Sequence, residues 1–306
     1  MYLCFTTNNK LQISHMYQVL SKDTITLEIL PYLSVAKRGF TCKADITEVI
    51  NGILYKLKTG IQWHMLPVKS LFSDVVLSYK TLFYHFRKWC KNGEWKYMWT
   101  NLLKKYRSKL DMSSVDLDGS HTRATKGGES VGYQGRKKSK TTNALYLTDR
   151  QGLPLAMSVP VSGEHNDLYR IKRSTDEIFG TLEEAGISVD GLFLNADAGF
   201  DSEDFRNQCL SHGVFPNVCF NKRNGGYDRN ELLINELYRK RYIIERTNAW
   251  MDSFRSVLVR HDTTLTSWEA WNYIVFAVLL LRNIKHSLVK MTSIKRTTKN
   301  TELTEK

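Results

Sequence analysis

The chain has 306 residues, with 44 Lys and Arg against 31 Asp and Glu, so its net charge is +13 and its pI is near 9.4. A hydrophobic fraction of 42% is enough to build a buried core. The longest uninterrupted apolar run, Ile274 to Leu281, is far shorter than the roughly 20 residues that a membrane helix needs. The five cysteines form no CxxC pair and no zinc-like spacing, so we expect a reduced cytosolic protein.

The positive charge favours a polyanionic partner, with nucleic acid ahead of an anionic membrane surface. A basic enzyme without such a partner is the alternative. The sequence contains no P-loop and no dinucleotide-binding glycine pattern, so neither ATP nor NAD is expected.

The first 110 residues are predicted to be mostly helical. Apolar residues recur at spacings of three and four in 45–57, where Asp45 is a candidate N-cap, and a second helical stretch in 78–106 is broken at Asn92-Gly93. We expect the four tryptophans of this part to form a core rather than a base-stacking platform. We therefore predict an N-terminal extension, 1–30, and a small helical domain, 31–110, which is a candidate for DNA contact.

The pattern changes to strands after Met112. Five strands are predicted, at 113–124, 141–149, 153–161, 191–197 and 214–220. Helices are predicted at 167–187 and 201–213, followed by a long helix at 230–254 and a core helix at 268–288. This order is typical of an RNase H-like α/β domain with a mixed five-stranded sheet, which we place at 111–290. The polar residues 291–306 are predicted to be disordered.

Three acids stand out by position. Asp118 lies in the first strand, Asp197 ends the fourth, and Glu245 lies within the long helix. The first and fourth strands are neighbours in an RNase H-like sheet, so the two aspartates are expected to converge, and the helix would add the third carboxylate. Such carboxylates can bind two divalent ions roughly 3.5–4 Å apart, which activate a nucleophile and stabilise the leaving oxygen of a phosphodiester. Mg²⁺ suits oxygen ligands of this kind.

Each acid has a competing interpretation. Asp116 is the alternative to Asp118. Asp201 is the alternative to Asp197, although it fits better as the N-cap of the next helix. Glu245 is also spaced to pair with Arg241, four residues earlier.

Basic residues near these acids are candidate contacts to DNA phosphates. They come from the run GRKKSK and from the end of the fifth strand: Arg136, Lys137, Lys138, Lys140, Lys222 and Arg223. His121 is expected to be a structural neighbour of Asp118. Asn166 or Asp167 is expected to cap the helix that follows, with a supporting role near the metals as the alternative for Asp167.

The motifs "DGSHTRATKGG", "NADAGFDS" and "RKRYIIERTNAWMDSFR" resemble the three acid motifs of DDE-type bacterial insertion-sequence transposases, in particular the family numbered five. "GIQWHMLP" and "TLFYHFRKWCKNGEW" resemble the N-terminal region of the same proteins, so the resemblance covers most of the chain. It implies that Asp118, Asp197 and Glu245 are the catalytic, metal-binding triad.

A further signature of related elements places Tyr, Arg, Glu and Lys on the last of these helices. Tyr238, Arg241 and Glu245 match it and are expected to share one helix face, whereas Asp252 stands at the lysine position. Tyr238, Arg241 and Arg246 are expected to contact DNA, and either Arg246 or Arg255 is a candidate to replace the missing lysine.

The resemblance implies a Mg²⁺-dependent transposase, with Mn²⁺ as a substitute, acting on DNA in a bacterial cytoplasm. Its partners would be double-stranded DNA, both terminal inverted repeats and target, and a second copy of the chain in a synaptic complex. Cleavage and strand transfer are the implied reactions. The alternatives are a related polynucleotidyl nuclease without strand transfer and a DNA-binding remnant.

Overall fold

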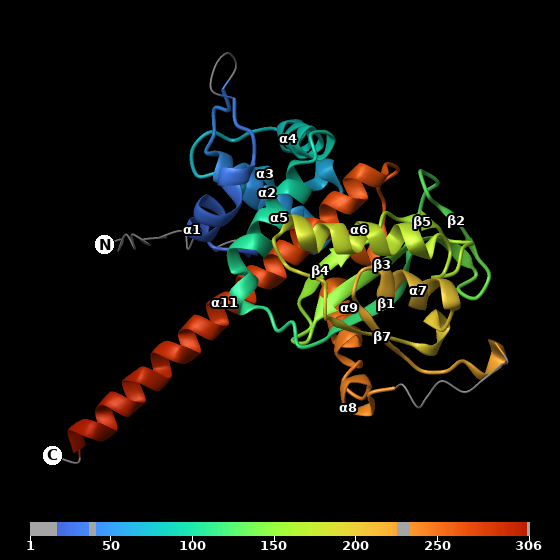
Figure 1. Cartoon of the computed structure of the whole chain (residues 1–306). Coiled ribbons are helices and arrows are strands. Elements are labelled where there is room, and N and C mark those ends of the chain that lie inside the picture. The colour runs from blue at the N-terminus through green and yellow to red at the C-terminus, as the bar shows by residue number, and fades with distance from the viewer. Residues whose placement is uncertain (1–16, 37–40, 225–232, 305–306) are drawn as a thin grey trace, which may run out of the picture.

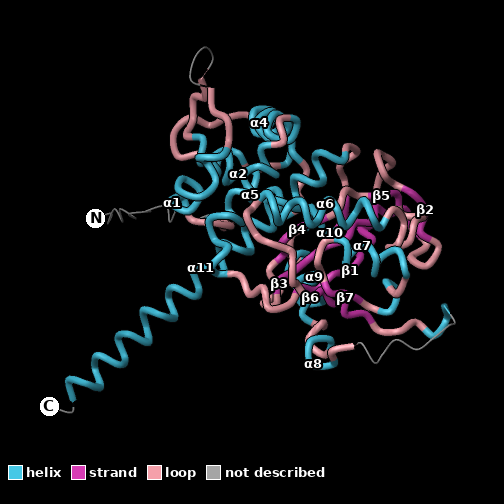
Figure 2. The backbone as a smooth tube through the Cα atoms, viewed as in Figure 1, coloured by secondary structure: helices cyan, strands magenta, loops and turns pink. Residues whose placement is uncertain are grey.

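The computed structural model describes residues 17–36, 41–224 and 233–304, with the side chains of the last helix described up to residue 284. A curled sheet lies beside a group of N-terminal helices, and the last helix begins between them and extends away at its C-terminal end (Figure 1). Figure 2 shows the same division, with the strands gathered on one side and the N-terminal helices on the other. In the described part of the chain, no helix is long and apolar enough to cross a membrane.

The N-terminal helices form because apolar residues repeat at helical spacing between clear end signals. In α2 (Ile46–Thr59) the side chain of Asp45 accepts a hydrogen bond from Thr47 N at 2.9 Å, as predicted, and Gly60 ends the helix at φ 70°. The other elements of this part are α1 (Lys22–Thr24), η1 (Ile25–Ile29), η2 (Leu30–Tyr32), η3 (Trp63–Met65), α3 (Val68–Leu71), α4 (Tyr79–Lys91), α5 (Glu94–Tyr106) and η4 (Arg107–Lys109).

The tryptophans of these helices belong to the core, as predicted. Trp89, Trp95 and Trp99 are fully buried, and Trp63 is half-buried and stacks on Trp271. Trp99 Nε1 donates to the carbonyl oxygen of Leu155, which joins the helical part to the sheet. One continuous hydrophobic cluster runs from Val19 to Leu281, and it includes four residues of the segment that we assigned to an extension: Val19, Leu20, Ile25 and Ile29.

The sheet has the strand order expected for an RNase H-like fold. Strand β1 (Val115–Ala124) pairs antiparallel with β3 (Ser139–Asp149), which pairs antiparallel with β4 (Pro154–Met157). On its other side β1 runs parallel to β6 (Phe193–Ala196), which runs parallel to β7 (Phe215–Val218). These five strands are the five predicted ones. Three short strands, β2 (Gly132–Gln134), β5 (Val161–Ser162) and β8 (Val259–Arg260), complete the eight-stranded sheet.

Helices connect the parallel strands and cover the sheet. They are α6 (Ile171–Glu184), η5 (Ala198–Phe200), α7 (Glu203–Ser211), η6 (Lys222–Asn224), α8 (Asn235–Tyr238), α9 (Ile243–Asp252), α10 (Arg255–Leu258) and α11 (Leu265–Thr304). The backbone of α11 continues to Thr304, through most of the segment that we predicted to be disordered. Nothing in this stretch breaks a helix, since it contains neither proline nor glycine.

The predicted long helix at 230–254 is wrong in its continuity. The chain between α8 and α9 follows tighter turns, in which Arg241 N donates to Tyr238 O and Ile243 N to Lys240 O. Tyr238 therefore lies in α8 and Glu245 in α9, so they do not share the face of one helix, and residues 230–232 lie outside the described residues.

Candidate active site

The sheet brings Asp118 and Asp197 to neighbouring positions because their strands are parallel and in register. The last paired residues of β1 and β6 are Asp116 and Asn195. Two residues further along each strand the chain reaches Asp118 and Asp197, on the same side as this last pair because side chains alternate. Both aspartates line one cavity of about 690 Å³. The prediction that they converge is confirmed by this placement, while their roles stay a prediction.

Other chain segments contribute side chains to the same cavity. They come from the end of β1, from the β2–β3 hairpin, from the loop after β5 and from α9: Ser120, His121, Gln134, Arg136, Lys137, Glu164, Asn166, Asp167 and Asn248. The cavity thus combines carboxylates with two cations and a histidine.

Asp118 is held by two hydrogen bonds and lies in the field of other charges. Its Oδ1 accepts from Gly119 N at 3.0 Å, and its Oδ2 accepts from Asn248 Nδ2 at 3.4 Å. Burial, together with the carboxylates of Asp197 and Asp167, raises the pKa of Asp118 to about 6, although Arg241 opposes this rise. A cation in the cavity would relieve this repulsion between carboxylates.

Asp197 is fixed by the turn that follows its strand. Its Oδ1 accepts a hydrogen bond from Gly199 N at 2.8 Å, which caps η5. The competing acid, Asp201, has a different position: it is buried, it accepts from Arg206, and it accepts from Asn221 N through Oδ2. It is not the cap of α7 that we predicted, because the hydroxyl of Ser202 accepts from Phe205 N instead.

Asp116, the competitor of Asp118, is part of a buried polar ladder. It is fully buried and accepts from Asn195 Nδ2 at 2.9 Å. The oxygen of Asn195 accepts from Asn217 Nδ2, and the oxygen of Asn217 accepts from Ile234 N. These bonds link β1, β6 and β7 side by side, so Asp116 serves the sheet and does not line the cavity.

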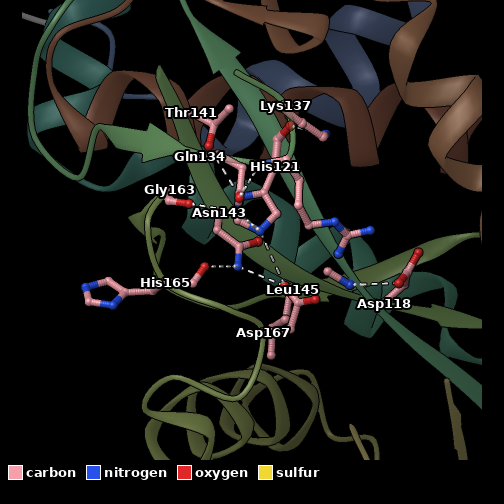
Figure 3. A network of polar contacts seen from close by, with 12 residues as sticks. Asp118, His121, Gln134, Lys137, Thr141, Asn143, Leu145, Gly163, His165 and Asp167 are labelled. Atoms are coloured by element: carbon pink, nitrogen blue, oxygen red, sulfur yellow. Dashed lines mark hydrogen bonds and ion pairs between the residues drawn. The ribbon is translucent and has the colours of Figure 1, made fainter. Parts of the chain in front are cut away.

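Asp167 was expected to cap α6, and this expectation is wrong. The N-cap position of α6 is Arg170, with a left-handed φ of 53° and no side-chain cap, so the helix begins later than predicted. Asp167 Oδ1 instead accepts from Asn143 Nδ2 at 2.8 Å and lies 3.9 Å from His121 Nε2 (Figure 3). The carboxylate packs directly on Gly119, where a Cβ would lie only 2.2 Å from Oδ1.

His121 is the centre of the polar network drawn in Figure 3. Its ring contacts Thr141 Oγ1 and Gln134 Nε2, and its carbonyl oxygen accepts from Lys137 Nζ at 2.7 Å. Burial lowers the pKa of His121, and Lys137 and Arg136 lower it further while Asp167 opposes them. The imidazole is therefore biased towards its neutral form.

Glu245, the third predicted acid, does not line this cavity. It is exposed in the first turn of α9, whereas Asn248, one turn later, reaches Asp118. Among the described residues, no group of three or more His, Cys, Asp or Glu side chains is arranged to hold a metal ion. Two further carboxylates, Asp167 and Glu164, line the cavity together with Asp118 and Asp197.

The predicted DNA contacts divide between the cavity and the surface. Arg136 and Lys137 line the cavity, and Arg241 acts electrostatically on Asp118. Outside the lining are the exposed residues Lys138, Lys140, Lys222, Arg223 and Arg246, and also Tyr238.

The two candidates for the missing lysine also lie away from the lining. Arg246 Nη2 donates to the carbonyl oxygen of Gln151, and Arg255 packs where Gly60 has no side chain.

Comparison with known proteins covers both parts of the chain. The family model "Transposase DDE domain" matches residues 109–281, and the model "Putative transposase of IS4/5 family" matches residues 27–99. The insertion element IS402 uncharacterized 16.2 kDa protein of Burkholderia cepacia is 33% identical over 85 residues, which are 27% of this chain. The aligned region spans about half, 55%, of that relative.

Solved structures of the Mos1 transposase are also similar to this chain. The pre-cleavage Mos1 transpososome aligns with 80% of each chain at 11% identity and a TM-score of 0.28. The Mos1 paired-end complex with the left transposon end gives a TM-score of 0.27 at the same identity and coverage.

The DDE-domain model spans more than half of the chain and includes both strands that carry Asp118 and Asp197 into the cavity. The chain belongs to the family of proteins with a transposase DDE domain.

Proposed function

We propose that the protein binds the terminal inverted repeats of an insertion sequence, cleaves DNA at their ends and joins those ends to target DNA. The observation that carries the proposal is the single cavity that contains Asp118 and Asp197 from adjacent parallel strands, with Arg136 and Lys137 beside them. Carboxylates for a metal and cations for a phosphate are the two requirements of phosphodiester chemistry.

DDE transposases generally use divalent metal ions. The donors fit a hard cation, since they are oxygen atoms and since burial and like charge hold the pKa of Asp118 well above its usual range. We propose Mg²⁺, with Mn²⁺ as a substitute, held by Asp118 and Asp197. When bound, the metal would activate the attacking oxygen and stabilise the leaving one.

The third carboxylate has two candidates. Glu245 is the acid that the sequence motif predicts, and Asp167 is supported by its place in the cavity. The chain's own groups would do the remaining work: Asn248 and the amide of Gly119 hold Asp118, and Arg241 offsets the negative charge around it.

DNA is the proposed partner because the net charge of +13 suits a polyanion. Contacts are proposed for Tyr238, Arg241, Arg246, Lys222 and Arg223, and for the cations of the β2–β3 hairpin. Bringing two element ends together would require at least a homodimer. We place this activity in a bacterial cytoplasm, where an insertion sequence and its target DNA are found.

Three assays separate this proposal from its rivals. Cleavage of a labelled repeat end, in the presence of Mg²⁺ or Mn²⁺, tests the chemistry. A strand-transfer product with supercoiled target DNA supports the transposase over a nuclease, because a nuclease gives cut ends only. Tight, salt-dependent binding without cleavage would favour a DNA-binding remnant.

A further inference from the structure

The β2–β3 hairpin divides its four cations between two places. Its loop closes at Lys138, whose φ of 46° is left-handed and whose N donates to Gly135 O. This reversal places Arg136 and Lys137 in the cavity lining and leaves Lys138 and Lys140 outside it, although all four cations are exposed. Adjacent lysines of one charge run therefore face different surroundings.

Lys137 is anchored, unlike a freely solvated lysine. Its Nζ donates to the carbonyl oxygen of His121 at 2.7 Å, three residues along β1 from Asp118 (Figure 3). This bond uses one of the three donors of an ammonium group, so donors remain for a second acceptor. Burial raises the pKa of Asp252, the last residue of α9, and the charge of Lys137 opposes this rise. The ammonium group of Lys137 therefore lies near the end of α9.

The cavity needs such a cation if a phosphodiester is to enter it. Four acids line it, and their charge would repel a phosphate. An anchored ammonium group in the lining that Asp118 and Asp197 share supplies attraction inside the cavity, whereas a lysine on the outer loop attracts DNA without placing a particular phosphate.

We propose that Lys137 binds the phosphate that reacts at the active site, while Lys138 and Lys140 hold the DNA backbone outside the cavity. This inference rests on the proposed function and assigns separate tasks within one charge run. Lys137 then acts on the chemical step, and the outer lysines act on affinity.

The test compares Lys137→Ala with the matched variants Lys138→Ala and Lys140→Ala on a duplex that carries the element's repeat. For Lys137→Ala we expect single-turnover cleavage at saturating DNA to fall about 10- to 100-fold, since a lost charge-stabilising donor costs this much or more. Its Kd should change by less than about threefold, and Lys137→Arg should recover part of the rate.

The outer variants should show the opposite result. Each should weaken binding and reduce the slope of log K against log salt by about one, with a cleavage rate at saturation within about threefold of the wild type. The inference is overturned if Lys137→Ala follows the same pattern as Lys138→Ala.

A second measurement keeps the inference testable if the wild-type protein does not cleave, a result that would contradict the proposed function itself. Acetylation of lysines, followed by mass spectrometry, compares the free wild-type protein with its complex with the repeat duplex. Protection of Lys137 by DNA supports phosphate binding in the cavity. Unchanged acetylation of Lys137, with protection of Lys138 and Lys140, overturns it.

Discussion

Replacing Gly119 by alanine tests how closely the carboxylate of Asp167 packs on the backbone of Gly119. A Cβ at Gly119 would lie 2.2 Å from Asp167 Oδ1 and 2.4 Å from its Cγ, whereas ordinary contacts begin at 3.4 Å. The carboxylate would have to retreat by about 1.2 Å, which also disturbs its 2.8 Å hydrogen bond from Asn143. Gly119 lies in a strand without a positive φ, so alanine adds contact but no backbone strain.

The expected loss in the free energy of unfolding is about 1–3 kcal/mol, the usual cost of overpacking. Urea unfolding of Gly119→Ala would be measured in the wild-type background and in Asp167→Ala, which removes the three atoms nearest to the added Cβ. In the second background the cost should nearly vanish, and this difference is the coupling energy. Gly127→Ala is the matched control, because a Cβ there meets nothing within 4 Å, and it should change stability by less than about 0.5 kcal/mol. An equal cost of Gly119→Ala in both backgrounds would refute the proposed contact.

Three further predictions concern single acids. Asp167→Asn and Glu245→Gln should be compared in single-turnover cleavage and in Mn²⁺ binding by calorimetry. If only Asp167→Asn loses cleavage and Mn²⁺ binding, Asp167 is the third carboxylate, as its place in the cavity indicates. If only Glu245→Gln loses them, Glu245 is the third carboxylate, as the sequence motif predicts. Asp201→Ala should destabilise the fold by about 3–5 kcal/mol in urea unfolding because it leaves Arg206 buried without this carboxylate; a change below 1 kcal/mol would contradict this. Burial raises the pKa of Glu269 from 4.5 to about 7, so ionisation of this buried group lowers the stability of the fold as the pH rises through this range. The free energy of unfolding of Glu269→Gln should therefore exceed that of the wild type by roughly 2–3 kcal/mol at pH 8 and by almost nothing at pH 4. A constant difference across pH would disprove it.

The sequence was informative wherever local pattern and strand order decide the structure. Hydrophobic alternation predicted the five main strands, and the order of elements predicted that β1 and β6 are neighbours, which brings Asp118 and Asp197 together. The cap of α2 at Asp45 followed from residue type alone. The strands and the helix cap depend on residues close together in sequence, and the pairing of β1 with β6 depends on the strand order of the RNase H-like sheet.

The remaining site residues depend on contacts between segments that are distant in sequence. Asp167 resembled a helix cap, but its partner is Asn143 in β3, and only the fold shows that Gly119 makes room for it. Likewise the motif around Glu245 does not reveal that Asn248 faces Asp118 or that Lys137 faces inward while Lys138 does not. One available signal was the spacing of three between Glu245 and Asn248.

The most direct test measures cleavage of a labelled DNA end that carries the element's own repeat, in the presence of Mg²⁺ or Mn²⁺. It compares the wild type with Asp197→Ala. The account predicts metal-dependent nicking at the repeat boundary in the wild type and none in the variant, with both proteins equally folded and equally able to bind DNA. Equal cleavage by both proteins would contradict the assignment of Asp197, and binding without cleavage in both would contradict the enzyme itself.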